Sequence, residues 1–396
     1  MVNRMVDSSK WLELLICIVL LMKVNSYNVP ITIVQDAVAK GGVCLDGSPP
    51  AYHLDKGYGA GVNNWLIHMQ GGAWCNNATT CLDRSQTPLG SSKLMSTNYY
   101  FTGILSNKSK HNPDFYNWNR VKVRYCDGSS YTGDVDAVDP NTKIFYRGAR
   151  VWRAVMDDLL AKGMKNARNA VLAGCSAGGL GAILQCDNFR ALFPSGAKVK
   201  CLSDAGLFIN TESISGTRPL EELYAEVVTT HGSAKNLPEA CTSKFRPELC
   251  MLPQYAARYI QTPLFLLNSA YDAWQISNIL IQGVVDADGK WRNCLISGIS
   301  RCSDSQNQAL KCFKKQFLAG LSTICDNNPT TGFFINSCFC HCQSDAQETW
   351  LSDDSPRLDN TTIAKAVGDW FYDRNPFQEI DCPYPCDKTC RGVASA

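Results

Sequence analysis

Residues 169–180 read Asn-Ala-Val-Leu-Ala-Gly-Cys-Ser-Ala-Gly-Gly-Leu and contain a G-x-S-x-G sequence centred on Ser176. The apolar run 170–173 before it predicts a buried strand, and the apolar segment 180–192 after it predicts a helix. Glycines are needed between the two because a side chain there would collide with the neighbouring backbone. The stretch therefore predicts a serine held in a sharp turn from strand to helix.

This arrangement is that of the nucleophile elbow of α/β-hydrolases, in which the turn exposes a reactive serine. The following helix points its N-terminus at the reaction centre, where it stabilises a developing negative charge. We interpret Ser176 as a nucleophile. The alternative is a glycine-rich turn with an incidental serine.

Three further apolar runs, 65–69, 121–125 and 263–267, also predict buried strands. Apolar side chains recur with helical spacing over 151–160, and Lys162-Gly163 closes this predicted helix. Alternation of strand and helix predicts an α/β fold, with a mostly parallel sheet and helices on both faces. Without a repeat or linker in the sequence, we expect one α/β-hydrolase-like domain over 27–396, with a disulfide-rich C-terminal third.

The composition is that of a globular protein, with 45% hydrophobic and 19% charged residues among 396. The formal net charge is only +2, and no long run of like charges occurs. Neither a nucleic-acid partner nor binding to a membrane through a basic segment is therefore expected.

Twenty cysteines indicate a secreted, oxidised protein. Arg4 and Lys10 precede the apolar run 11–22, and small residues follow it, so 1–26 is interpreted as a signal peptide. The run is shorter than the roughly 20 residues that span a bilayer; a retained anchor is the alternative. The sequons at Asn77, Asn107 and Asn360 predict N-glycosylation, and the destination is expected to be the cell wall or extracellular space.

Removal of the signal peptide would remove Cys17 and leave an odd number of cysteines, so one or three thiols must be free within the chain. Cys340 is the favoured free thiol and Cys175 the second candidate. The pairs expected from spacing are Cys75 with Cys81, Cys186 with Cys201, and Cys312 with Cys325.

Zinc binding by Cys338-x-Cys340-His341-Cys342 or by the Cys382, Cys386, Cys390 array is disfavoured, because secreted thiols pair with each other first. No metal is expected.

A serine nucleophile needs a base and an orienting acid, which follow it in the order acid, histidine in this fold. Only His231 and His341 come after Ser176. His231 stands at a predicted helix end, where histidines often cap carbonyls. His341 lies in a cysteine-rich loop after a short apolar run and is favoured as the base.

Asp272 follows the predicted strand 263–267 and is favoured as the acid, with Asp204 as its rival. The loop Gln70–Trp74 directly follows the strand 65–69, which is where the second set of oxyanion donors should lie. The alternative is a glycine turn closed by a Cys75–Cys81 bridge, and both descriptions can hold together.

The chain resembles the plant pectin acetylesterases, whose animal relative is the secreted carboxylesterase Notum. The matching segments span nearly the whole mature chain: Val43–Ser48, Gly71–Cys75, Tyr125–Ser130, Gly148–Trp152, Gly174–Gly179, Asn268–Asp272, Asn336–Cys338 and Cys382–Cys386. Cys340, Cys312 and Cys325 depart from the usual plant pattern.

The resemblance implies a catalytic triad of Ser176, Asp272 and His341. It also implies oxyanion donors at the backbone N–H groups of Gly72, Ala73 and Ala177.

The implied function is hydrolysis of O-acetyl esters of cell-wall pectin through an acetyl-enzyme, without a cofactor. Acetylated pectin is then the partner, and no obligate protein partner is expected. Two alternatives remain open: a Notum-like deacylase of a lipid-modified protein, and an inactive carbohydrate-binding protein with the same fold.

Overall fold

The structure is a computed structural model that describes residues 28–138, 140–296 and 298–390. The predicted signal peptide, residues 1–26, lies outside the described residues. No helix among the described residues is both long enough and apolar enough to cross a membrane.

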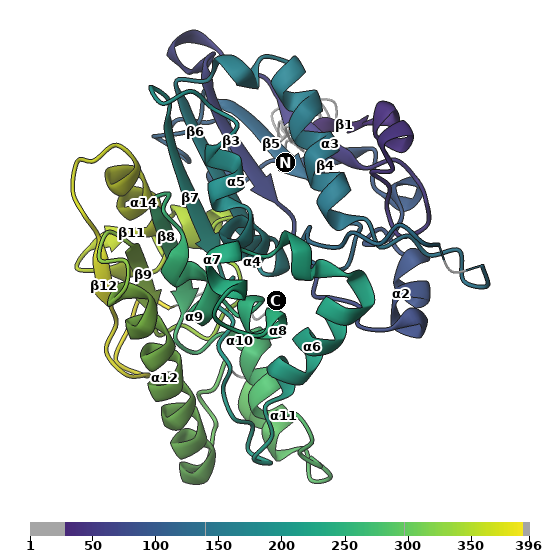
Figure 1. Cartoon of the computed structure of the whole chain (residues 1–396). Coiled ribbons are helices and arrows are strands. Elements are labelled where there is room, and N and C mark those ends of the chain that lie inside the picture. Colours follow the sequence, from purple (N-terminus) through teal and green to yellow (C-terminus); the bar gives the residue numbers. More distant parts are fainter. Residues whose placement is uncertain (1–27, 139, 297, 391–396) are drawn as a thin grey trace, which may run out of the picture.

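Within this part of the chain, ten strands form one sheet in the order β12-β9-β8-β7-β6-β3-β5-β2-β1-β4, and β10 pairs with β11 (Figure 1). The strands are β1 Asn28–Ile33, β2 Ala51–Asp55, β3 Asn64–Met69, β4 Asn98–Tyr100, β5 Asn119–Val123, β6 Asn169–Cys175, β7 Lys198–Asp204, β8 Leu264–Ser269, β9 Gly332–Asn336, β10 Arg357–Leu358, β11 Thr361–Thr362 and β12 Gln378–Ile380. Neighbouring strands from β12 to β5 run parallel, while β2, β1 and β4 extend that end of the sheet in antiparallel fashion. The sheet is therefore mostly parallel, as predicted.

The α-helices are α2 Ala78–Ser85, α3 Gly148–Ala161, α4 Ala177–Leu184, α5 Cys186–Arg190, α6 Pro219–His231, α7 Glu239–Thr242, α8 Pro247–Cys250, α9 Pro253–Ala256, α10 Ala273–Gln275, α11 Lys290–Ile296, α12 Asp304–Cys325, α13 Gln347–Trp350 and α14 Ile363–Phe371. The shorter 3-10 and π turns are η1 Gln35–Lys40, η2 Gly59–Gly61, η3 Ser92–Leu94, η4 Gly103–Leu105, η5 Met164–Asn166, η6 Ser233–Asn236, η7 Ala257–Tyr259 and η8 Ile276–Leu280.

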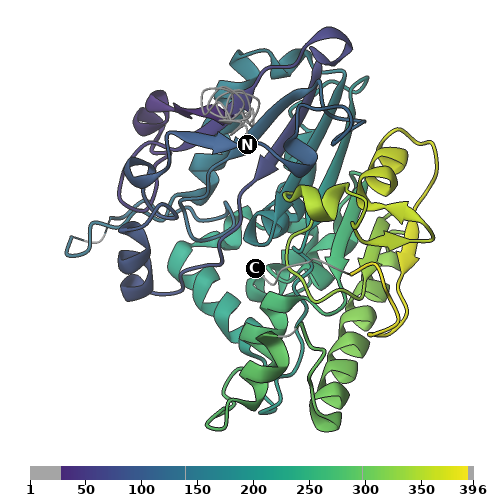
Figure 2. The same ribbon diagram turned by 180° about the vertical axis from the view of Figure 1, so that it is seen from behind.

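Side chains of the central strand β6 alternate between the two faces of the sheet, as the pleat requires. Ala170 and Leu172 pack into the larger core, with apolar residues of α3, α4, α6 and α12. Val171 and Ala173 pack into the second core, with apolar residues of α14. Helices thus cover both faces, and the ribbon can be followed from the front in Figure 1 and from behind in Figure 2.

The predicted strands 65–69, 170–173 and 263–267 correspond to β3, β6 and β8, and the helix predicted over 151–160 is α3. The predicted strand 121–125 ends earlier, because β5 stops at Val123. The helix predicted over 180–192 is two helices, α4 and α5, separated at Gln185, whose side chain donates to the carbonyl of Tyr131.

Eight disulfides join described cysteines: Cys44–Cys126, Cys75–Cys81, Cys175–Cys342, Cys186–Cys201, Cys241–Cys250, Cys294–Cys302, Cys338–Cys390 and Cys382–Cys386. Two of the three expected short-range pairs are correct.

The expected Cys312–Cys325 pair is wrong, and both thiols are free. They lie 13 residues apart on α12, which separates them by roughly 20 Å along the helix axis at about 1.5 Å per residue. Cys340 is free, as predicted, and it is buried.

Candidate active site

Ser176 occupies the turn between β6 and α4 with φ 59° and ψ −128°, a strained backbone conformation for a residue with a side chain. A Cβ atom on Gly174 would lie 2.2 Å from the carbonyl oxygen of Gly178, and one on Gly178 would lie 2.3 Å from that of Met69. Only glycine fits at these two positions. The serine N–H donates to the carbonyl of Asp204 at 2.9 Å, which ties the turn to β7.

The loop after β3 passes directly against this turn. A Cβ atom on Gly71 would lie 2.7 Å from the Cβ of Ser176. Gly72 and Ala73 follow with φ of 137° and 54°, so two successive residues have left-handed backbone conformations. The glycine loop and the serine turn are therefore adjacent, at the carboxyl ends of the neighbouring strands β3 and β6.

His341 lies in the loop after β9 and pairs with Asp272, whose Oδ2 is 2.8 Å from His341 Nδ1. Asp272 is fully buried and caps α10, since its Oδ1 accepts a hydrogen bond from Gln275 N at 2.9 Å. Both carboxylate oxygens are thus occupied, which fixes the orientation of the imidazole. Nε2 of His341 is buried and has no hydrogen-bond partner within the described residues.

The charge state of His341 reflects two opposing effects. Burial lowers its pKa, but the attraction and the hydrogen bond of the Asp272 carboxylate, together with the attraction of the Asp204 carboxylate, outweigh burial, and the pKa is raised above its ordinary value. The ring therefore gains proton affinity while Nε2 stays available.

The disulfide Cys175–Cys342 brings the histidine loop to the serine turn. Cys175 immediately precedes Ser176 and Cys342 immediately follows His341, and their Cα atoms are 5.6 Å apart. Cys175, the second candidate for the free thiol, is therefore bonded and not free. A bridge is compatible with this tight turn because Cys175 is still the last residue of β6, and the turn itself begins at Ser176.

Asp204, the rival acid, does not bond to His341. It is fully buried at the end of β7, and its Oδ2 accepts hydrogen bonds from Gln343 N, Ser344 N and Ser344 Oγ at 2.8, 2.6 and 2.6 Å. Burial raises the pKa of Asp204 to about 6. The carboxylate therefore holds the segment that follows the histidine.

An ionic group centred on Asp345 extends this support and was not predicted from the sequence. Asp345 binds Lys122 Nζ of β5 at 2.7 Å and His68 Nε2 of β3 at 2.9 Å. Lys122 is 1% exposed in the middle of the sheet. A lysine between Val121 and Val123 in a predicted buried strand is the signal that could have indicated such a partner.

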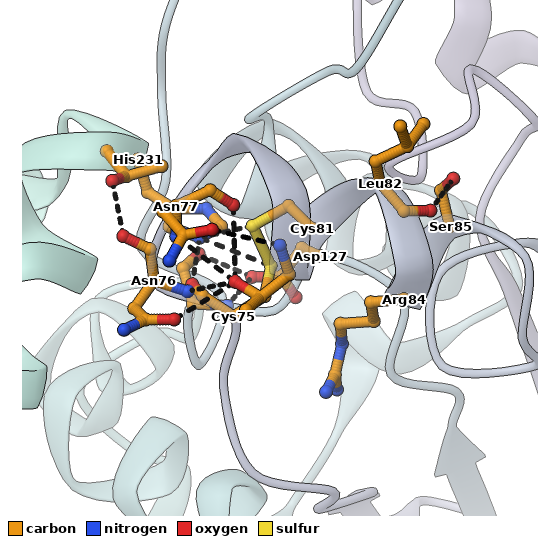
Figure 3. Close-up of a disulfide and its surroundings, with 12 residues drawn as sticks. Cys75, Asn76, Asn77, Cys81, Leu82, Arg84, Ser85, Asp127 and His231 are labelled. Carbon is orange, nitrogen blue, oxygen red and sulfur yellow. Dashed lines mark hydrogen bonds between the residues drawn. A yellow bond between two sulfur atoms is a disulfide. The ribbon is translucent and has the colours of Figure 1, made fainter. Parts of the chain in front are cut away.

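His231, the other candidate base, lies at the end of α6 beside the Cys75–Cys81 disulfide (Figure 3). Its Nε2 is 2.8 Å from the carbonyl oxygen of Cys75, and burial lowers its pKa to about 4. His231 therefore binds a carbonyl, as expected, but this carbonyl belongs to Cys75, which follows the glycine loop, and not to its own helix α6.

Three groups of metal-ligand side chains lie close together in the described chain: Cys75, Cys81 and His231; Cys338, Asp387 and Cys390; and Asp381, Cys382 and Cys386. In each group the two cysteines form a disulfide with one another. None of the three therefore offers a pair of thiolates.

Comparison with known proteins identifies the family. A family model described as pectinacetylesterase matches residues 22–391. The chain belongs to the pectin acetylesterase family. The resemblance found in the sequence is thereby confirmed, and members of this family are carboxylic ester hydrolases.

Two relatives from Arabidopsis thaliana, pectin acetylesterases 7 and 11, are each 53% identical over 386 residues, which make up 97% of this chain and 98% of the relative. A palmitoleoyl-protein carboxylesterase of Danio rerio, notum1a, is 30% identical over 267 residues, or 63% of this chain and 52% of that protein. The pectin acetylesterases thus match nearly the whole chain at 53% identity, whereas this Notum relative matches a shorter part of it at 30% identity.

Proposed function

We propose that the protein is a secreted serine esterase that removes O-acetyl groups from pectin, with Ser176, His341 and Asp272 as its catalytic triad. The observation that carries the proposal is the His341–Asp272 pair at 2.8 Å, together with the disulfide that joins the residue after His341 to the residue before the strained Ser176. The near full-length similarity to pectin acetylesterases supports the substrate class.

In the first half of the reaction, Ser176 Oγ attacks the acetyl carbonyl carbon while its proton passes to His341 Nε2. The ester oxygen of the sugar leaves and takes that proton from the imidazolium as the tetrahedral intermediate collapses. The second half repeats these steps with water, which gives its proton to the imidazole and releases acetate from Ser176. No step requires a metal or an organic cofactor.

Charge on the tetrahedral intermediate is carried by its former carbonyl oxygen. In this proposal, that oxyanion accepts hydrogen bonds from the backbone N–H groups of Gly72, Ala73 and Ala177. The contact of Gly71 with Ser176 and the start of α4 at Ala177 support these donors, because both segments border the nucleophile. Asp272 stabilises the imidazolium through Nδ1.

Secretion to the cell wall is supported by the eight disulfides, which persist in oxidising compartments. The proposed glycosylation sites Asn77 and Asn360 are exposed, and Asn107 is half-buried. Cleavage after residue 26 and the three glycans would be tested by N-terminal sequencing and glycopeptide mass analysis of the protein recovered from the medium.

The decisive experiment measures acetate release from acetylated pectin by the purified protein, beside hydrolysis of a long-chain acyl ester. Ser176→Ala should lower kcat on the order of 10⁶-fold. Ser203→Ala is the matched control, because this buried hydroxyl on β7 has no hydrogen-bond partner among the described residues. Activity on the long-chain ester alone, or a Ser176→Ala variant as active as the control, would refute the proposal.

A further inference from the structure

The segment 125–131, which we call the clamp segment, reads Tyr-Cys-Asp-Gly-Ser-Ser-Tyr and has no part in the reaction described above. It follows β5 and is buried throughout, with Tyr125, Asp127, Ser130 and Tyr131 all 0% exposed. Its polar groups must therefore find partners inside the protein.

Two of those partners lie in the glycine loop. The hydroxyl of Tyr125 donates to the carbonyl of Ala73 at 3.0 Å, and the hydroxyl of Tyr131 donates to the carbonyl of Gln70 at 3.3 Å. These two carbonyls stand on either side of the peptide groups whose N–H atoms belong to Gly72 and Ala73. The two phenols thus hold the loop at both ends of its proposed oxyanion donors.

Ser130 connects the same loop to the nucleophile helix. Its hydroxyl donates to the carbonyl of Ala177 at 2.7 Å and accepts from the indole N–H of Trp74 at 2.8 Å. Its backbone N–H donates to the hydroxyl of Tyr125 at 2.9 Å. One residue therefore links the start of α4, the end of the glycine loop and the first of the two phenols.

The clamp segment is itself held in an unusual conformation. Ser130 and Tyr131 have φ of 52° and 63°, which is strained for residues with side chains. The carboxylate of Asp127 stabilises this turn, because Oδ2 accepts from Ser129 N, Ser129 Oγ and Tyr131 N at 3.0, 2.5 and 3.0 Å. The neighbouring Cys126 is bonded to Cys44, which attaches the segment to the chain before β2.

We propose that Tyr125, Tyr131 and Ser130 are positioning residues that set the geometry of the oxyanion hole; this inference rests on the proposed function. Gly72 and Ala73 carry little side chain to hold them in place, and glycine leaves the backbone many conformations. Donor N–H groups stabilise an oxyanion only within roughly 2.7–3.1 Å of its position. Hydrogen bonds to the flanking carbonyls supply the restraint that the loop's own residues lack.

The test compares Tyr125→Phe, Tyr131→Phe and the double variant with Tyr224→Phe. Tyr224 is a matched control, since it is also 0% exposed and its hydroxyl has no hydrogen-bond partner in the described chain. Each clamp variant should lower kcat for acetate release roughly 10-fold, less than the loss of one oxyanion donor, which costs about 10²–10³-fold. KM should stay within about twofold, because the acetyl group is contacted by the donors mainly in the transition state.

A second readout uses p-nitrophenyl methylphosphonate, a small activated phosphonate monoester. The nucleophilic serine attacks its phosphorus, p-nitrophenolate leaves, and a negatively charged tetrahedral adduct remains on the serine. The rate of inactivation should fall in parallel with kcat in both clamp variants and stay unchanged in Tyr224→Phe. Clamp variants that match the control in kcat would overturn the inference, and so would a fall in kcat with an unchanged inactivation rate. If Tyr125→Phe does not fold, Tyr131→Phe and Ser130→Ala carry the same test.

The inference and the proposed function fail in different ways. A Ser176→Ala variant that remains active removes the proposed function, whatever the tyrosine variants do. An inactive Ser176→Ala variant beside tyrosine variants with the kcat of Tyr224→Phe leaves the triad in place and rejects only the positioning role.

Discussion

Removing the disulfide Cys175–Cys342 should reduce catalysis more than its effect on stability would explain. The bridge joins the residue before the proposed nucleophile to the residue after the proposed base. In the variant Cys175→Ala/Cys342→Ala, the histidine loop keeps its hydrogen bonds to Asp204 but loses its covalent link to the serine turn. A displacement of about 1 Å in a catalytic constellation costs on the order of 100-fold in rate, and this is the expected fall in kcat.

The expected loss of stability can be worked out from the length of chain that the bridge closes. The two cysteines are 167 residues apart, and the chain-entropy relation then gives about 5 kcal/mol at 25 °C. Disulfides inside this loop shorten it only a little, and the dependence on length is logarithmic. An unfolding entropy of roughly 2.1 cal/mol/K per residue over about 360 ordered residues converts 5 kcal/mol into a fall in Tm of about 7 °C.

The matched control is Cys186→Ala/Cys201→Ala, which removes a bridge between α5 and β7 that closes 15 residues. Its expected cost is about 3 kcal/mol, or roughly 4 °C in Tm. Thermal unfolding and kcat on acetylated pectin are measured for both variants, with the assays run well below either Tm. If the Cys175/Cys342 variant keeps more than half of the control's kcat, the bridge does not position the catalytic residues.

Two further predictions concern the base and the free thiols. Asp272→Asn should lower kcat roughly 10⁴-fold, because it spoils the tautomer and orientation of His341. Asp272 raises the pKa of His341, so kcat/KM of the wild type should fall as the pH drops through a value above about 6.5. The residual activity of Asp272→Asn should fall only at a lower pH. If both proteins lose activity at the same acidic pH, this explanation is refuted. Alkylation of the native protein should label exposed Cys312 and spare Cys340, because Cys340 is buried and burial raises the pKa of its thiol. Peptide mass mapping after brief iodoacetamide treatment checks this, and early label on Cys340 would contradict it.

The sequence was sufficient to predict those elements whose conformation is set by residues close to one another in the chain. The turn at Ser176 requires Gly174 and Gly178 for steric reasons, so the G-x-S-x-G sequence and its flanking apolar runs predict strand, turn and helix together. The antiparallel end of the sheet was not predicted. There, β4 has only three residues, of which Asn98 and Tyr100 are exposed, and it pairs with β1 across 70 residues of chain.

The candidate catalytic residues were found from chemistry and order in the chain. Few side chains can serve as base or acid, and only two histidines follow Ser176, so the order of residues in the chain leaves few candidates for the base. The pairing of Cys175 with Cys342 could not be found in this way, because spacing carries no information about a partner 167 residues away. The wrong Cys312–Cys325 pair has the same cause, since cysteines that are near in the sequence need not be near in space.

The residues that hold the site differ in kind from those proposed to react in it. Asp204 acts on a loop 139 residues away through ordinary hydrogen bonds, and Tyr125 acts on Ala73 in the same manner. Many polar side chains could make such bonds, so residue type alone does not identify them. In the proposed mechanism they act through the peptide segments that they hold, because each of these segments carries a proposed donor or base. Mutagenesis limited to the triad would therefore measure the loss of reacting groups, while the accuracy with which this fold positions them would be measured at Tyr125, Tyr131 and the Cys175–Cys342 bridge.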